Sequence, residues 1–117
     1  MAAPDYTIIA TRVISLLDRG FRDPGICLKA LTPDVGCADY EISRCLVAAT
    51  GRGFREHLRQ RRLDEATRLL AEDALSLKEI SSQAGFGSAS QFTRQFRAAV
   101  GITPSTYRRL LRMRRAS

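Results

Sequence analysis

Few residues of this chain could serve as catalytic or metal-binding groups. Of its 117 residues one is a histidine, His57, and three are cysteines, Cys27, Cys37 and Cys45. The cysteines are odd in number and include no C-x-x-C pair, so they favour neither a zinc framework nor a disulfide-stabilised secreted fold. We therefore expect reduced thiols in a cytoplasmic protein, with no bound metal and no cofactor.

Familiar catalytic arrangements are also missing from the sequence. No serine–histidine or cysteine–histidine pairing stands out, and no paired carboxylates mark a cleft. The glycines of Gly85-Phe86-Gly87 have the pattern of a turn and not of a nucleotide-binding loop. We predict that His57 is packed or half-exposed and not catalytic, and that the chain is not an enzyme.

The chain lacks a long hydrophobic run as well. Its first apolar stretch, residues 7–17, is too short to span a membrane and is interrupted by Arg12. No basic segment precedes this stretch, as one would in a signal peptide. We expect no membrane as a partner.

Positive charge, in contrast, is abundant and uneven. The formal net charge is +7 and the isoelectric point lies near 10.2. Residues 1–53 hold six basic and six acidic side chains, whereas residues 54–117 hold thirteen and six. Such an excess favours a polyanionic partner, either nucleic acid or an acidic membrane surface.

The spacing of apolar residues predicts an all-α fold of about seven helices. The first four helices are expected over residues 6–19, 26–36, 39–50 and 54–72. Pro33 lies within the second of these, so that helix should be short or kinked. The side chains expected to face inward are Ile8, Ile9, Val13, Leu16, Leu17, Leu28, Leu31, Ile42, Cys45, Leu46, Ala49, Phe54, Leu58, Leu63, Ala66, Leu69 and Leu70.

Residues 76–107 predict two short helices around a tight turn, followed by a third helix start. Ser76 and Glu79 form a capping box, Gly85 can stop the helix with a positive φ, and Ser88 can cap the next one. The apolar face of that next helix comprises Phe92, Phe96, Ala99 and Val100. Thr103 is the expected cap of the last helix, with Pro104 at its first position. A helix–turn–helix of this kind places its second helix in a DNA major groove.

A weak internal repeat at an offset of fifty residues indicates two such motifs. The matched pairs are Ser43 and Thr93, Arg44 and Arg94, Leu46 and Phe96, and Gly51 and Gly101. We therefore predict two tandem helix-turn-helix subdomains, in residues 1–53 and 74–117, joined by a long connecting helix in residues 54–73.

The second motif also resembles the signature of the AraC/XylS transcriptional regulators. The matching residues are Gly85, Phe86, Ser88, Phe92, Arg94, Phe96, Arg97, Gly101, Thr103, Pro104, Tyr107 and Arg108. The resemblance implies a sequence-specific regulator of transcription, expected to be an activator, that binds double-stranded DNA. It is similar to the short MarA-like members, which implies a monomer that recruits RNA polymerase; alternatively the chain is a fragment of a longer regulator.

The resemblance and the helix geometry assign roles to particular side chains. The residues expected at DNA bases are Ala89, Ser90, Gln91 and Arg94 in the second motif and Tyr40, Ser43 and Arg44 in the first. Those expected at phosphates are Thr93, Arg97, Ser105, Thr106 and Arg62. Gln and Arg can pair bidentately with adenine and guanine, and the start of the last helix favours an anion.

The first motif departs from this pattern and leaves an alternative open. Asp39 and Glu41 stand beside Arg44 and would repel phosphates, and Val47 replaces the arginine of the second motif. We expect the first motif to bind DNA more weakly. The alternative is a protein-interaction module that keeps a degenerate helix-turn-helix fold and modulates a larger regulator.

Overall fold

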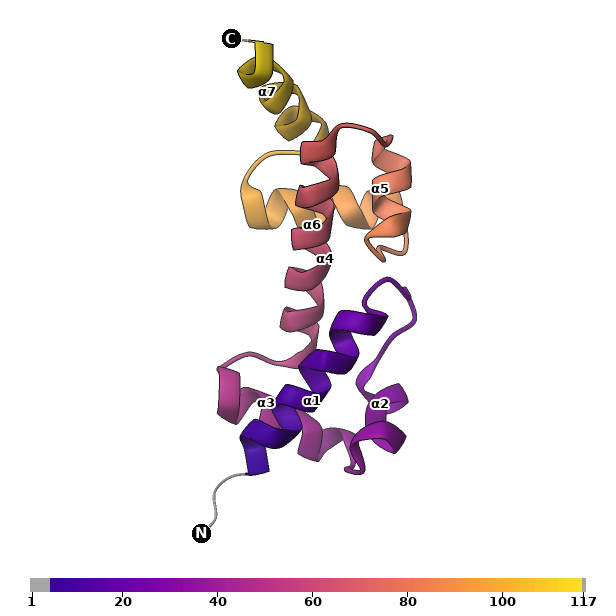
Figure 1. Ribbon diagram of the computed structural model, residues 1–117, viewed down its shortest axis with the longest axis vertical. Helices are drawn as coiled ribbons and strands as arrows, with labels where there is room; N and C mark the ends of the chain where they lie inside the picture. Colours follow the sequence, from indigo (N-terminus) through magenta and orange to yellow (C-terminus); the bar gives the residue numbers. More distant parts are fainter. Residues whose placement is uncertain (1–4, 117) are drawn as a thin grey trace. The chain divides into compact units, whose positions relative to one another are not determined.

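The computed structural model describes residues 5–116, and this part of the chain forms seven helices and no strand (Figure 1). The helices are α1 (Asp5–Gly20), α2 (Leu28–Val35), α3 (Asp39–Thr50), α4 (Phe54–Glu72), α5 (Leu77–Gln83), α6 (Ala89–Val100) and α7 (Pro104–Ala116). The predicted all-α fold is confirmed. The chain divides between Gln60 and Arg61 into two compact units, each with its own hydrophobic core.

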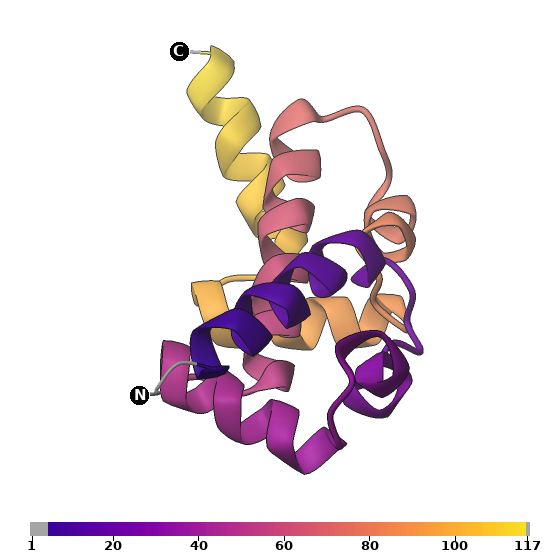
Figure 2. The same cartoon turned by 60° about the horizontal axis from the view of Figure 1, so that its bottom comes forward.

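In the first unit, α1, α2, α3 and the start of α4 enclose one core. Val13 and Leu17 of α1 are buried because they lie one helical turn apart on the same face. α1 and α3 lie against each other in both views (Figures 1 and 2). The buried side chains of this core are Ala10, Val13, Leu17, Phe21, Leu31, Ile42, Leu46, Phe54 and Leu58.

α2 continues through a proline. The Pro33 nitrogen carries no hydrogen, so the carbonyl of Lys29, four residues earlier, loses its usual helical donor. The Thr32 hydroxyl donates to that carbonyl oxygen at 2.9 Å and takes the place of the missing bond. α2 then ends at Gly36, whose φ is 83°. With 8 residues the helix is short, as Pro33 predicted.

The second unit is built around a row of aromatic rings. The ring centroids of Phe86 and Phe92 lie 5.0 Å apart, those of Phe92 and Phe96 5.8 Å, and those of Phe96 and Tyr107 5.4 Å. Each such pair contributes about 0.5–1.5 kcal/mol beyond the burial of its area. The other buried side chains of this core are Leu63, Ala66, Leu69, Leu70, Ile80 and Ala84.

α4 has the bounds that the sequence predicted, residues 54–72. All of its predicted inward side chains are buried. Phe54 and Leu58 belong to the core of the first unit, and Leu63 and the apolar residues after it belong to the core of the second. One helix therefore contributes to both cores.

Four side chains that were predicted to face inward lie at the surface instead. Ile8 is 69% exposed and Val100 is 45% exposed, and Ala49 and Ala99 are exposed too. All four occupy the first or last turn of their helices. Helical periodicity identifies the face on which a residue lies, but not whether another element covers that turn. Cys45, also expected in the core, is half-buried.

His57 packs within the first unit, as the sequence predicted. Its Nε2 atom lies 2.8 Å from the Thr50 hydroxyl oxygen. Burial, and then the charge of Arg52, lower the pKa of His57. The imidazole therefore links the end of α3 to α4.

Candidate nucleic-acid interface

The two ends of α5 have the capping residues that the sequence predicted. The Ser76 hydroxyl accepts a hydrogen bond from the Glu79 N–H at 3.1 Å, and the Glu79 carboxylate accepts one from the Ser76 N–H at 2.9 Å. The bond from the Ser76 N–H lowers the pKa of Glu79. Gly85 follows α5 with a φ of 93°. Together these features complete α5 and turn the chain toward α6.

Ser88 caps the start of α6, and its hydroxyl accepts a hydrogen bond from the Gln91 N–H at 3.1 Å. Phe92 and Phe96 are buried on the inner side of the helix. The predicted DNA-contacting residues of this helix lie on its outer side, and all are exposed. We call them the α6 outer face: Ala89, Ser90, Gln91, Thr93, Arg94 and Arg97.

The α6 outer face is basic and rich in hydrogen-bonding groups. An open groove runs along it, lined by Ala89, Ser90, Thr93, Arg94, Arg97 and Ala98. Gln91 and Arg94 are three residues apart, so they are neighbours on the helix surface. The first turn of α6 contains no acidic residue. The groove thus brings together Ala89, Ser90, Thr93, Arg94 and Arg97 on a surface that suits a polyanion, and Gln91 does not line it.

The outer face of α3 has a different chemistry. Tyr40 is 63% exposed and Val47 is 47% exposed, and Arg44 is exposed as well. Asp39 and Glu41 occupy the first turn of α3. This surface therefore combines one cation with two carboxylates and two apolar side chains.

The third predicted residue of the first motif, Ser43, lies apart from this surface. It is half-buried and lines a groove together with Lys29 of α2 and Arg55 of α4. Arg44 instead lines a depression shared with Tyr6. Ser43 and Arg44 therefore line separate hollows.

The start of α3 is capped by acidic side chains. Ala38, the residue before the helix, has no side-chain acceptor, and the Glu41 carboxylate accepts a hydrogen bond from the Ala38 N–H at 3.1 Å. The Asp39 carboxylate accepts from the Tyr40 N–H at 2.8 Å. Where α6 uses a neutral hydroxyl, α3 uses negative charge.

The start of α7 carries two predicted phosphate ligands. The Thr103 hydroxyl accepts from the Thr106 N–H at 3.3 Å and donates to the Thr106 Oγ1 at 2.9 Å, which confirms Thr103 as the cap. Pro104 is buried at the first helical position. Ser105 is exposed and Thr106 is half-buried. Arg62, the remaining predicted phosphate ligand, is half-buried on α4.

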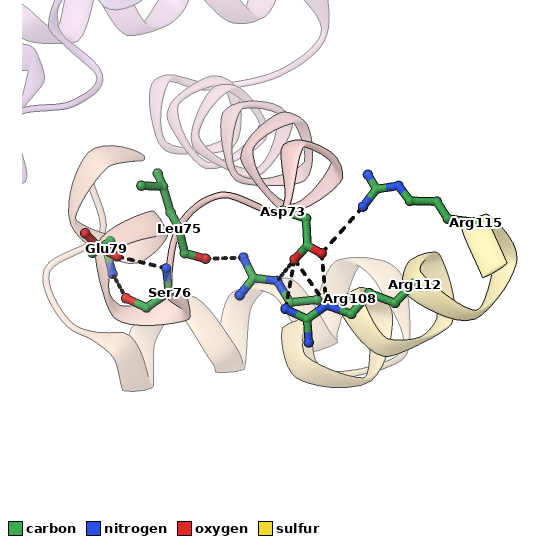
Figure 3. Close-up of polar contacts among 7 residues, drawn as sticks. All are labelled: Asp73, Leu75, Ser76, Glu79, Arg108, Arg112 and Arg115. Carbon is green, nitrogen blue, oxygen red and sulfur yellow. Dashed lines mark hydrogen bonds and ion pairs between the residues drawn. The ribbon is translucent and has the colours of Figure 1, made fainter.

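Asp73, in the turn after α4, is the acidic partner of three arginines on α7 (Figure 3). Arg112 donates to it through Nε at 3.0 Å and Nη2 at 2.9 Å. Arg108 and Arg115 lie 3.4 and 3.6 Å from its carboxylate oxygens. The hydrogen bonds from Arg112, with the charges of the other two arginines, lower the pKa of Asp73. Arg108 also donates to the Leu75 carbonyl.

The sequence reasoning missed this cluster. Arg108, Arg112 and Arg115 share one face of α7 because they are spaced i, i+4, i+7, and that spacing was the available signal. Their partner, Asp73, lies far earlier in the chain. Its positive φ of 55° could not be predicted from the residues around it. The cluster attaches α7, and with it Ser105 and Thr106, to the turn that leads into α5 (Figure 3).

The described residues contain neither a cluster of metal ligands nor a membrane-spanning helix. No group of three or more histidine, cysteine or acidic side chains gathers there as metal ligands would. Within residues 5–116, no helix combines the length and the apolar character needed to cross a membrane.

Residues 31–110 match a protein family described as a helix-turn-helix domain. Among curated proteins the chain is 33% identical over 99 residues to the transcriptional activator NphR of a Rhodococcus species, covering 85% of this chain and 29% of that protein. It is 31% identical over 102 residues to the transcriptional activator RhaR of Salmonella schwarzengrund, covering 87% of this chain and 34% of that protein. The chain thus spans about a third of the length of these relatives.

Solved structures show the same fold. The DNA-binding domain of AdpA, solved in complex with a target DNA, matches 92% of this chain and 96% of that one with a TM-score of 0.84 and 23% identity. The C-terminal domain of the response regulator yesN from Fusobacterium nucleatum matches 84% of this chain and 95% of that one, with a TM-score of 0.79 and 26% identity.

The family match covers more than half of the chain and includes both predicted recognition helices, α3 and α6. The residues that carry the resemblance lie where such a motif needs them, with the phenylalanines buried and Arg94 exposed. The chain therefore belongs to the AraC/XylS family of helix-turn-helix, DNA-binding transcription regulators, a family of regulators and not of enzymes.

Proposed function

We propose that the chain recognises a specific double-stranded DNA sequence through two adjacent major-groove segments, one for α6 and one for α3, about one helical turn (~34 Å) apart. Residues 54–73 then connect a first motif in residues 1–53 to a second in residues 74–117. The observation that carries the proposal is the α6 outer face, which is exposed, basic and supported from behind by the buried rings of Phe92 and Phe96.

Within this proposal, Gln91 and Arg94 are the main base readers. Both lie on the exposed side of the recognition helix. A glutamine amide can pair bidentately with adenine and an arginine guanidinium with guanine, and each good pair is worth about 1–3 kcal/mol of discrimination. Ala89 and Ser90 lie in the first turn, the part of a recognition helix that approaches base edges most closely.

A second set of side chains binds the DNA backbone. Thr93 and Arg97 contact phosphates on either side of the base readers. Ser105, Thr106 and the amide groups that open α7 hold another phosphate, because the positive end of a helix dipole favours an anion. Arg62 on α4 supplies a further cation. Contacts of this kind set register and affinity but carry no sequence information.

The first motif contributes less to binding in this proposal. Arg44 reads a base, Tyr40 contacts a thymine methyl group or a sugar, and Ser43 contributes a hydroxyl from its separate groove. Asp39 and Glu41 oppose the approach of phosphates because like charges repel across the same surface. We therefore expect α3 to discriminate less strongly than α6.

Activation of transcription is also part of the proposal. The relatives NphR and RhaR are named activators, and this chain spans 29% and 34% of their lengths. Two motifs in one chain allow a monomer to read an asymmetric site. RNA polymerase is then the expected protein partner at the promoter.

A second candidate function rests on the α3 surface. Exposed Tyr40 and Val47 beside Asp39 and Glu41 resemble a protein-binding surface more than a DNA-binding one. In that case the chain modulates a larger regulator through protein contacts and has little affinity for DNA.

Selection from a pool of random duplexes tests the proposed function. The proposal expects enrichment of one sequence, with the strongest preferences in the segment bound by α6. Failure to enrich any sequence would reject sequence-specific recognition and leave only nonspecific binding or the protein-interaction module.

The salt dependence of binding then separates those two. Each neutralised phosphate contributes a slope of about −0.9 in the logarithm of the binding constant against the logarithm of salt concentration. A steep slope indicates phosphate contacts. No measurable binding to any duplex at low salt would favour the protein-interaction module.

A further inference from the structure

Gly87, in the turn before α6, lies against the carboxamide of Gln91. A methyl carbon placed on the Gly87 Cα would lie 3.1 Å from Gln91 Oε1, 3.5 Å from Cδ and 3.6 Å from Nε2. All three atoms belong to the end of one side chain. A side chain at residue 87 would therefore press on the carboxamide, which would have to shift by a few tenths of an ångström.

The backbone of Gly87 does not itself require glycine. Gly85, two residues earlier, has a φ of 93°, a conformation that glycine adopts at little cost, whereas the φ of Gly87 is not positive. Alanine could therefore adopt the backbone conformation at position 87. What glycine provides here is space for Gln91.

The surroundings determine which group would move if that space were filled. Phe86 is buried and its ring packs on Phe92, which holds the turn in place on one side of Gly87. Ser88, on the other side, is bonded to the Gln91 N–H. The Gln91 carboxamide is the flexible partner: it is exposed, and among the described residues no hydrogen bond holds it.

We infer that Gly87 is a positioning residue for sequence recognition: it leaves room for the Gln91 carboxamide to lie over the start of α6, with its donor and acceptor both available to a base. The inference rests on the proposed function, because it assumes that Gln91 reads a base.

The test compares four proteins by selection from random duplexes: the wild-type chain, Gly87→Ala, Gln91→Ala and the double variant. The wild type should show a preference at one base pair that Gln91→Ala reduces by about tenfold. Gly87→Ala should reduce the preference at that same base pair and no other. The double variant should match Gln91→Ala, because the glycine acts only through the glutamine.

Gly25 offers a matched control. Its φ is also not positive, and the nearest atom to an added methyl carbon would lie at an ordinary 3.5 Å. Gly25→Ala should leave every base preference unchanged. Gly87→Ala should melt no lower than the wild type and keep its salt dependence, since neither its fold nor its phosphate contacts change.

The outcomes separate the two proposals. If the wild type enriches no sequence, the proposed function fails, and this inference fails with it. If the wild type enriches a sequence and Gln91→Ala alters one base pair while Gly87→Ala does not, only the inference is wrong. A Gly87→Ala protein that melts markedly lower would also overturn it, because glycine would then be needed for the fold. The inference would also be overturned if Gln91→Ala kept every base preference of the wild type.

Discussion

α3 and α6 have the same length and the same kind of C-terminal end, but their solvent-exposed side chains differ in chemistry. Each has 12 residues and ends at a glycine with positive φ, Gly51 at 80° and Gly101 at 96°. Leu46 and Phe96, fifty positions apart, are both fully buried. The inner faces of the two helices therefore bury an apolar side chain at the same position.

One difference between the outer faces comes from how the two helices are capped. A hydroxyl at Ser88 caps α6 and leaves the first turn without acidic residues. α3 follows an alanine and is capped by the carboxylate of Glu41. An acidic residue stabilises the start of a helix, but at a recognition helix it also faces the DNA. The comparison shows that the choice of cap can limit what a helix binds.

The largest expected effect is a loss of stability when a buried side chain of either helix is truncated. Phe96→Ala should destabilise the second unit by about 3–5 kcal/mol, and Leu46→Ala the first by about 2–5 kcal/mol. Phe96 should have the larger effect because it contacts the rings of Phe92 and Tyr107. Chemical denaturation monitored by circular dichroism measures both. Val100→Ala is the control and should change stability by less than about 0.5 kcal/mol, since Val100 is exposed.

The next largest effect is a loss of DNA discrimination when the exposed arginine of either helix is removed. Arg94→Ala should reduce discrimination for the preferred duplex by about 1–3 kcal/mol, the value of a bidentate base contact. Arg44→Ala should reduce it less, because Asp39 and Glu41 already weaken the approach of α3 to DNA. Fluorescence anisotropy with the selected duplex and a mismatched one measures both. Equal losses would remove the asymmetry between the two helices.

Exchanging the caps sharpens the comparison. Ser88→Ala should destabilise the second unit by about 1 kcal/mol, because it leaves the Gln91 N–H without its acceptor. Ala38→Ser should stabilise the first unit by a similar amount, because it completes a capping box with Glu41. Thermal melting checks both. A destabilising effect of Ala38→Ser would show that the start of α3 cannot accept a hydroxyl.

Acid should affect the second unit through Asp73. Its pKa in the folded protein is lowered by Arg112 and its neighbours. Its stabilising contribution is therefore present above the unfolded value of about 3.9 and is lost as the pH falls through the folded value. Asp73→Asn should be less stable than the wild type at neutral pH, and the difference should shrink in acid. A difference that stays constant from neutral pH to pH 2 would exclude this role.

The smallest expected effect concerns the acidic cap itself. Asp39→Asn with Glu41→Gln removes two negative charges and keeps groups that can accept the same hydrogen bonds. DNA affinity should rise by roughly 0.5 kcal/mol for each exposed charge removed, and the gain should shrink at high salt. Titration with duplex at two salt concentrations measures it. A loss of affinity would indicate that α3 contacts a protein or a base through these carboxylates.

Local signals in the sequence predicted the elements of the fold well. The bounds of α4, the Ser76–Glu79 box and the Ser88 cap follow from contacts within a few residues, which a sequence displays directly. Ala49 and Val100 were wrong because burial in a last turn depends on whether another element covers it. The grouping of the outer face of α6 was predictable from helical periodicity.

Features that depend on tertiary packing or on the position of a single side chain were not predictable. The Asp73 cluster requires knowing that α7 returns to the turn after α4. The space at Gly87 depends on where the Gln91 side chain lies, which no pattern of residue types encodes. The separation of Ser43 from Arg44 likewise depends on the packing of α2 and α4 around α3.

The central claim is that the outer face of α6 is the surface that binds DNA, and backbone amide chemical shifts measured by NMR during titration with the selected duplex test it most directly. We predict that the largest shifts fall on residues 87–97 and at the start of α7, with smaller shifts on residues 39–47 of α3. Unchanged amides across residues 87–97 in a saturated complex would contradict the account.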